Sequence, residues 1–292
     1  YMKILVTGGA GFIGYNLTQM LLDQDHKVTV LDNFKSGTNT IDHSNVNYIK
    51  DDCRFVNGLW PDGNKFDIIY HLAALPRIQF SIKNPERVYE ANSTGTLQVA
   101  EFARMHNIPI VYAGTSSVHS GVTENPYTLT KYFGERILET YSALYNINVC
   151  TTRFYNVYGN PIVYEGPYGL VMTIFTKQWL NQQPLTITGD GEQRRDFTHV
   201  EDICDGFVKA GNKMVDGTLS GYSTFELGTG KNYSVNELGD MFDPNNKQYV
   251  PARKGEARTT LANNSDAKNK LGWNPKDRLV EFVNEFKRRN SN

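Results

Sequence analysis

The feature that most constrains this sequence is a glycine-rich segment near its start, residues 7–14, in which Gly8, Gly11 and Gly14 follow a G-x-x-G-x-x-G spacing. The apolar run 3–6 is typical of a buried strand, and apolar residues after the glycines recur at helical spacing. In such a unit Gly8 permits a sharp turn, Gly11 leaves space for a pyrophosphate, and Gly14 lets the helix pack closely on the sheet. The segment therefore predicts a phosphate-binding turn at a helix N-terminus.

A carboxylate after the next strand-like run indicates that the bound phosphate belongs to a dinucleotide. Residues 28–31 form a second apolar run, and Asp32 follows it, 18 residues after Gly14. An acid at this distance typically accepts hydrogen bonds from the hydroxyls of the adenosine ribose. The alternative, a glycine turn with a purely structural role, is disfavoured by this spacing.

Strand-like and helix-like segments alternate along the first half of the chain, which predicts an α/β fold: a Rossmann-type, doubly wound parallel sheet. We expect a dinucleotide-binding domain over residues 1–153, with a strand and a helix returning to it near 186–211. Residues 154–292 would mainly form a smaller, interleaved α/β substrate-binding domain. The expected strands are 46–49, 67–74, 110–114, 147–151 and 185–187, and the expected helices are 85–106, 127–145 and 171–180.

Composition narrows the class of protein further. The chain has 292 residues, 39% of them hydrophobic, and a formal net charge of −1 without a lysine–arginine stripe, so we expect no nucleic-acid partner. It has neither an apolar run long enough to span a membrane nor a signal peptide. Cys53, Cys150 and Cys204 are widely spaced, which predicts no metal site and fits a reducing, cytoplasmic compartment.

A tyrosine and a lysine four residues apart, Tyr127 and Lys131, share one face of a predicted helix, and Thr115 follows a predicted strand across the cleft. A neighbouring lysine and an oxidised nicotinamide both favour a phenolate, so we expect the pKa of Tyr127 to be lowered. The set suits removal of a proton from an alcohol while a hydride leaves the same carbon. Tyr-x-x-x-Lys also occurs by chance, so the interpretation depends on the order of the motifs along the chain.

In combination, these motifs resemble the extended short-chain dehydrogenase/reductase family, and within it the NAD-dependent nucleotide-sugar epimerases and dehydratases. The similarity is greatest to UDP-glucose and UDP-GlcNAc 4-epimerases. It implies bound NAD, transient oxidation at C4 of a UDP-hexose or UDP-uronate, and return of the hydride to the opposite face. The segments that carry the resemblance are 7–14, 32–33, 71–74, 92–96, 115–118, 127–131, 153–159, 189–202 and 253–256.

The resemblance implies three sets of site residues. The catalytic residues would be Thr115, Tyr127 and Lys131. The cofactor-binding residues would be Gly8, Gly11, Phe12, Ile13, Gly14, Asp32, Asn33, Ser36, Asp52, Cys53, Leu72, Ala73 and Ala74, together with Tyr127 and Lys131. The substrate-binding residues would be Ser116, Ser117, Asn156, Arg195, Arg253, Glu256 and Thr260.

Individual residues of the substrate set suggest which groups they would contact. Arg195 and Arg253 could bind a diphosphate with charge-assisted hydrogen bonds. Glu256 could accept from the uridine ribose. Thr260 is small, which favours a pocket that admits an N-acetyl group, whereas Arg77 could instead meet a uronate carboxylate or simply lie at the surface.

The chain departs from the family pattern in ways that leave alternatives open. Only 11 residues separate Thr115 from Tyr127, about half the usual number, and His119 and Ser120 replace the usual Tyr-Gly. The family's dehydratases carry Asp-Glu after the hydroxyl residue, where this chain has serines, so dehydration is disfavoured. A decarboxylase, a net dehydrogenase and a non-catalytic NAD-binding regulator remain alternatives.

The resemblance also implies a homodimer, because the helices expected at 85–106 and 127–145 pair into a four-helix interface in this family. We expect their apolar residues Val99, Phe102, Leu138 and Tyr141 to be exposed. The alternative is that these side chains pack on the protein's own sheet.

Overall fold

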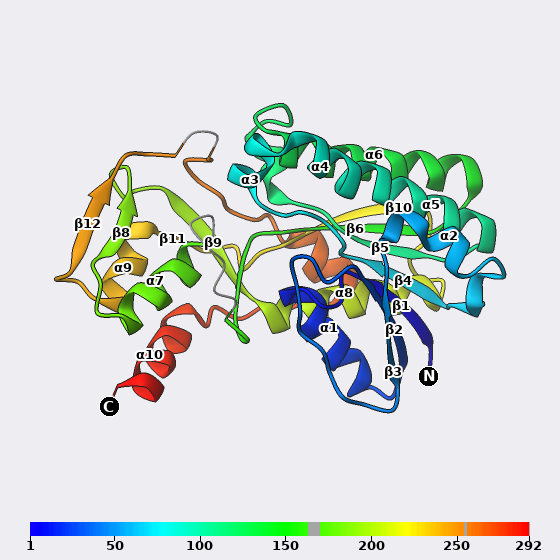
Figure 1. The fold of residues 1–292 in the computed structure, drawn as a ribbon, viewed down its shortest axis with the longest axis horizontal. Coiled ribbons are helices and arrows are strands. Elements are labelled where there is room, and N and C mark those ends of the chain that lie inside the picture. Colours follow the sequence, from blue (N-terminus) through cyan, green and yellow to red (C-terminus); the bar gives the residue numbers. More distant parts are fainter. Residues whose placement is uncertain (163–169, 254–255, 292) are drawn as a thin grey trace.

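The computed structural model describes residues 1–162, 170–253 and 256–291. Within them, seven parallel strands form a central sheet in the order β10-β6-β5-β4-β1-β2-β3, which confirms the predicted Rossmann-type α/β fold (Figure 1). The strand order reverses at β1, which pairs with β2 on one side and β4 on the other. The strands are β1 (Lys3–Thr7), β2 (Lys27–Asp32), β3 (Val46–Lys50), β4 (Ile68–His71), β5 (Ile110–Ala113), β6 (Val149–Phe154) and β10 (Tyr222–Leu227).

Helices cover both faces of this sheet (Figure 1). Helices α1 (Phe12–Leu22) and α8 (Val200–Val215) pack on one face, while α2 (Val56–Leu59), α5 (Gly95–His106) and α6 (Pro126–Tyr145) pack on the other. The sheet is therefore buried on both sides, as its nearly continuous apolar strands predict.

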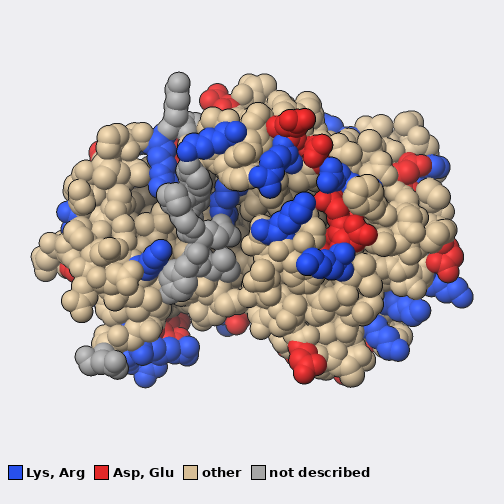
Figure 2. All heavy atoms as spheres, in the orientation of Figure 1, with Lys and Arg blue, Asp and Glu red and all other residues tan. Residues whose placement is uncertain are grey.

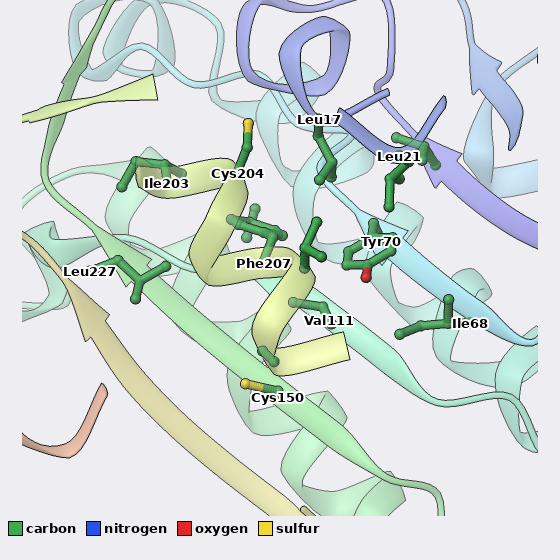
Figure 3. Packing of buried hydrophobic residues seen from close by; sticks show 14 of the residues in the cluster. Leu17, Leu21, Ile68, Tyr70, Val111, Cys150, Ile203, Cys204, Phe207 and Leu227 are labelled. Carbon is green, nitrogen blue, oxygen red and sulfur yellow. The ribbon is translucent and has the colours of Figure 1, made fainter. Parts of the chain in front are cut away.

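Successive residues of β4 alternate between the two layers, as the geometry of a strand requires. Ile68 and Tyr70 belong to the same core cluster as Leu17 of α1 and Phe207 of α8, and the ring centroids of Tyr70 and Phe207 lie 6.3 Å apart (Figure 3). Ile69 between them belongs to the cluster on the opposite face. The strand ends earlier than predicted, at His71, and the residues that follow it border the functional site described below.

The apolar side chains of α5 and α6 do not lie where the dimer hypothesis placed them. Val99, Phe102 and Leu138 have no exposed surface, because they pack on the sheet in the second core cluster. Tyr141 is half-buried and donates a hydrogen bond to Glu101 at 3.0 Å. The expectation that these residues form an exposed face is wrong, since each helix turns its more apolar stripe inward.

The long helix predicted at 85–106 is present but contains a wider turn. It begins with α4 (Pro85–Tyr89), continues through a π-helical turn at Glu90–Thr94, and ends as α5. A π-turn inserts an extra residue and re-aims the side chains around it. Here Asn92, which is almost fully buried, lies in the turn. The short helix α3 (Ile78–Lys83) precedes it.

The second half of the chain forms a smaller part around its own core cluster. In this half, β11, β9 and β7 form a small mixed sheet, and β12 pairs with β8, whereas α8 and β10 return to the central sheet. In the described ranges, no helix is both long enough and apolar enough to cross a membrane. The remaining elements are β7 (Asn156–Tyr158), α7 (Val171–Leu180), β8 (Leu185–Thr188), β9 (Arg194–His199), β11 (Asn232–Ser234), α9 (Val235–Phe242), β12 (Lys247–Val250) and α10 (Leu279–Asn290).

Candidate active site

A cavity of about 980 Å³ extends from the carboxyl ends of the central strands to the smaller part. Every residue that the sequence predicts for catalysis, cofactor binding or substrate binding lines it. Lys254 and Gly255, which belong to one of the recognised motifs, lie outside the described residues. Figure 2 shows basic side chains gathered over the middle of one face, with acidic ones among them. The charged lining residues are Asp32, Lys35, Asp51, Asp52, Arg54, Arg77, Arg87, Glu90, Glu124, Lys131, Arg195, Arg253 and Glu256.

The glycine turn after β1 has a shape that side chains would block. Gly8 has a φ of +75°, and a Cβ there would lie 2.6 Å from the backbone nitrogen of Ala73. A Cβ on Gly14 would lie 2.2 Å from the carbonyl oxygen of Gly8. A Cβ on Gly11 would instead meet that oxygen at an ordinary 3.4 Å, so the space beside Gly11 is open.

Helix α1 starts at this turn without a side-chain cap. Its first N–H groups therefore remain available to an anion, and the helix dipole favours negative charge there. The residues present thus fit the pyrophosphate of a dinucleotide.

Asp32 stands at the end of β2 beside the turn. Its two carboxylate oxygens accept hydrogen bonds from the backbone nitrogens of Ala10, at 3.0 Å, and Phe34, at 2.8 Å. Burial raises the pKa of Asp32, while the two backbone bonds lower it in part. Asn33 donates to Asp52 at 3.3 Å, which links the two segments predicted to hold the adenosine. These acceptors fit the hydroxyls of a ribose without a 2′-phosphate.

Asn92 positions the loop after β4 and is a residue whose role sequence reasoning missed. Its side-chain oxygen accepts from the backbone nitrogen of Leu75 at 2.8 Å, and its side-chain nitrogen donates to the hydroxyl of Thr130 at 3.1 Å. Thr130 in turn donates to the carbonyl oxygen of Tyr127 at 2.9 Å. Asn92 therefore connects the cofactor loop with the start of α6. The only signal in the sequence was its place in a family motif.

The start of α6 brings the predicted catalytic residues together. Asn125 caps the helix by accepting from the backbone nitrogen of Thr128 at 2.9 Å. Tyr127, in the first turn, lines the same cavity as Thr115, whose side chain acts to lower the pKa of the phenol. Thr115 also donates to the hydroxyl of Ser117 at 3.2 Å. A phenol and two aliphatic hydroxyls thus converge on one region of the cavity.

The pKa of Tyr127 moves in the direction opposite to the prediction. Burial raises it, and the side chain of Thr115 and the charge of Arg77 offset this only in part. In the protein alone the phenol is therefore protonated. The expected lowering therefore depends on the positive charge of a bound oxidised nicotinamide.

The pKa of Lys131 lies far from the ordinary value of a lysine. The residue is 3% exposed, and its ammonium lies 4.2 Å from the ring centroid of Tyr112. Burial lowers its pKa to about 7, although the charge of Glu135 opposes the shift. Both carboxylate oxygens of Glu135 accept from Arg153, the shortest of these bonds being 2.6 Å. The side chain of Lys131 is therefore protonated in only about half of the molecules near pH 7.

The end of the cavity predicted to bind substrate holds two arginines around one carboxylate. Glu256 lies 4.0 Å from Arg195 and 3.7 Å from Arg253. Burial lowers the pKa of Arg195, and Glu256 partly restores it. Both guanidinium groups line the cavity, so they are placed to receive a polyanionic group. Asn156, at the start of β7, lines the same region.

A buried carboxylate, that of Asp196, holds together the segments at this end of the cavity. Its structural role could not be predicted from the sequence. Asp196 has no exposed surface and accepts from the backbone nitrogens of Thr229, Gly230 and Ala262 at 2.9, 2.9 and 3.2 Å. Its own backbone nitrogen donates to the hydroxyl of Thr260 at 3.3 Å. Asp196 therefore holds β9, which carries Arg195, in a fixed position relative to the segment that contains Thr260.

The fold and the cavity are those of a dinucleotide-binding α/β protein, with Tyr127 and Lys131 one helical turn apart in the cavity. The profile of the NAD dependent epimerase/dehydratase family matches residues 4–221, and the chain belongs to this family. The cofactor of the family is NAD.

Relatives match the chain over nearly its whole length. The UDP-glucose 4-epimerase of Mycolicibacterium smegmatis is 32% identical over 97% of this chain and 96% of its own length. The crystal structure of UDP-glucose 4-epimerase from Thermotoga maritima, with UDP-glucose, has a TM-score of 0.89 at 29% identity and covers 99% of both chains. UDP-glucuronic acid 4-epimerase from Bacillus cereus, in complex with UDP-glucuronic acid and NAD, has a TM-score of 0.85 at 27% identity, over 99% of this chain and 100% of that one.

Proposed function

We propose that the chain is an NAD-dependent 4-epimerase of a UDP-sugar. One observation supports this most directly: Thr115, Tyr127 and Lys131 line the same cavity as the glycine turn after β1. When bound, the nicotinamide would supply a reversible hydride acceptor. A base, a hydride acceptor and an anion site in one cavity suit oxidation and re-reduction of one sugar carbon.

In the proposed reaction each residue would have a separate role. Tyr127 takes the proton from the C4 hydroxyl and returns it, and Thr115 orients the phenol and the sugar oxygen. Lys131 holds the nicotinamide ribose and, once protonated, stabilises the phenolate. Arg195 and Arg253 bind the diphosphate.

The remaining predicted residues would hold the two nucleotides. Gly8, Gly11 and Gly14 would place the pyrophosphate of the cofactor at the start of α1, and Asp32 would accept from the adenosine ribose. Phe12, Ile13, Asn33, Ser36, Asp52, Cys53, Leu72, Ala73 and Ala74 would line the rest of the dinucleotide, while Ser116, Ser117, Asn156, Glu256 and Thr260 would contact the UDP-sugar.

The geometry disfavours the alternative chemistry of a dehydratase. Ser116 and Ser117 line the cavity next to Thr115, and their hydroxyls provide neither a carboxylic acid nor a carboxylate at those positions. Two residues of the cavity favour different sugars as the substrate. Thr260 favours an N-acetylated hexose, whereas Arg77 favours a uronate.

The test is to incubate the protein with UDP-glucose, UDP-GlcNAc and UDP-glucuronate and to follow C4 inversion by NMR together with absorbance of NADH. Inversion of one sugar without accumulated NADH supports the proposal and identifies the substrate. The matched control is Tyr127→Phe, which should retain NAD but lose activity by about a thousandfold, the size of a general-base contribution. Accumulated NADH or a dehydrated product would contradict epimerisation.

We also propose a cytoplasmic homodimer, with residues 1–153 and 154–292 as its two interleaved domains. The surface that supports a dimer differs from the one predicted: Leu97 on α5 and Phe133 on α6 are 37% and 41% exposed. Light scattering should give twice the chain mass, and Phe133→Asp should give a monomer. The three free, buried cysteines fit a reducing compartment.

A further inference from the structure

The shortened loop 116–125 is joined to a distant strand by a pair of residues that no sequence motif identifies. A side-chain nitrogen of His119 contacts a carboxylate oxygen of Glu226, which lies near the end of β10. We propose that Glu226 is a positioning residue that, through His119, holds this loop as a fixed wall of the sugar pocket. The kinetic consequences of this proposal rest on the proposed reaction, whereas the anchoring itself does not.

The loop needs such an anchor because it has little regular structure of its own. It begins with a single 3-10 turn, Ser116–Ser120, and runs to the cap of α6 at Asn125. Ser116 and Ser117 at its start and Glu124 near its end line the cavity. A short polar loop with one helical turn would otherwise fluctuate among conformations, at a cost in conformational entropy on each binding event.

Glu226 is held from several sides, which makes it a rigid attachment point. Its other carboxylate oxygen accepts from the hydroxyl of Tyr155 at 2.8 Å and from the backbone nitrogen of Asn263 at 3.1 Å. Its backbone pairs with Arg153 on β6. One carboxylate therefore joins the loop, the segment before β7 and the segment that follows Thr260.

The charge of Glu226 is maintained by these same contacts. Burial acts to raise its pKa, but the hydrogen bonds from His119, Tyr155 and Asn263 more than offset this, so the pKa is lowered. The carboxylate is thus anionic at neutral pH and accepts from every partner. Removing it would leave the hydroxyl of the nearly buried Tyr155 without its acceptor as well as releasing the loop.

The position of the loop affects the proposed reaction because its first residues orient the hydroxyl of Thr115. The backbone nitrogen of Ser117 donates to the hydroxyl oxygen of Thr115 at 3.2 Å, and that hydroxyl donates to the side chain of Ser117 at 3.2 Å. Thr115 in turn lines the cavity with Tyr127 and acts to lower the pKa of its phenol. His119 lies two residues further along, so releasing it frees the turn that orients Thr115.

The experiment compares three single variants and one double variant by hydrogen exchange of loop amides, measured by mass spectrometry on the full-length, NAD-bound protein. His119→Phe removes the anchor and keeps a ring, while Glu226→Gln keeps an acceptor for Tyr155 but loses the charge. Both should exchange loop amides about tenfold faster than the unmodified protein. Tyr155→Phe is the matched comparison, because it removes a different bond to Glu226 and leaves the contact with His119, so it should speed loop exchange less than either of these variants.

The double variant of His119→Phe with Glu226→Gln should exchange no faster than either single variant, since both remove one interaction. UDP-glucose binding to these variants, measured by calorimetry, should weaken about tenfold while NAD affinity and melting temperature stay constant. In turnover, KM should rise more than kcat falls. A merely structural role would lower the melting temperature and NAD affinity together.

Unchanged loop exchange in His119→Phe would overturn the proposal whatever reaction the protein performs. Faster exchange without any change in UDP-glucose affinity would overturn the positioning role and leave only a structural contact. If the unmodified protein bound no UDP-sugar at all, the proposed function would fail, and hydrogen exchange would still decide whether the anchor exists.

Discussion

Replacing Lys131 with methionine should stabilise the protein that contains no nucleotide while abolishing its activity. Methionine has a similar length and no charge, so it fits the same buried space. Lowering a lysine pKa from 10.5 to about 7 corresponds to about 5 kcal/mol that the folded state loses when it carries the charge. The Lys131→Met variant avoids this loss, and its gain should approach that size at pH 6.

The gain should also depend on pH with a definite sign. Between about pH 7 and 10.5 the unfolded chain keeps a proton on Lys131 that the folded protein has released, so the stability of the unmodified protein rises with pH. The variant lacks this contribution. The difference between the two should therefore fall from about 5 kcal/mol at pH 6 to about 2 kcal/mol at pH 9.

The assay is urea unfolding at pH 6, 7, 8 and 9, after the nucleotide has been removed from both proteins. Lys177→Met, at an exposed position of α7, is the control and should change stability by no more than about 0.5 kcal/mol at any pH. A difference between Lys131→Met and the unmodified protein that stays constant with pH would refute the reasoning. A variant no more stable than the unmodified protein at pH 6 would refute it as well.

Two further predictions concern the glycine turn and the buried carboxylate of β9. Gly11→Ala should keep the melting temperature but weaken NAD binding at least tenfold by calorimetry, because its Cβ meets only Gly8, at 3.4 Å, and points to open space. Gly14→Ala should unfold at lower temperature even without NAD, because its Cβ would lie 2.2 Å from a backbone oxygen; equal melting temperatures for the two variants would contradict this contrast. Asp196→Ala removes the acceptor of three backbone N–H groups, of which that of Ala262 is buried and the other two are partly buried, and should cost about 3 kcal/mol in urea unfolding; a loss below about 1 kcal/mol would argue against its central role.

The first half of the fold was predictable because its signals are local. A strand, a glycine turn and a helix follow one another in β1 and α1, and the periodicity of apolar residues changes where the structure changes. In the second half, α7 was predictable from the same kind of signal, and it spans Val171–Leu180 as predicted. The proposed catalytic pair was visible in the sequence for the same reason, since Tyr127 and Lys131 are one helical turn apart.

Features that depend on contacts between distant segments could not be predicted. Glu226 meets His119 across 107 residues, and Asp196 meets Ala262 across 66. The inward direction of Phe102 also depends on the sheet beneath it, because a helix with apolar residues on two sides does not reveal which side faces the core. The pKa of Tyr127 belongs to the same group, since its burial is a property of the assembled cavity.

The surroundings of Lys131 explain why burial of its charge is only partly compensated. The four-residue spacing along α6 would favour an ion pair between Lys131 and Glu135. In the structure, however, both carboxylate oxygens of Glu135 accept hydrogen bonds from Arg153. With its carboxylate shared in this way, Glu135 offsets only part of the burial cost, and the ammonium is left beside the ring of Tyr112. A full ion pair would make the charge permanent and hold the side chain against the helix. With this weaker pairing the pKa of Lys131 stays near 7, and under the proposed function a hydrogen bond from its ammonium to a ribose hydroxyl would raise that pKa when the cofactor binds.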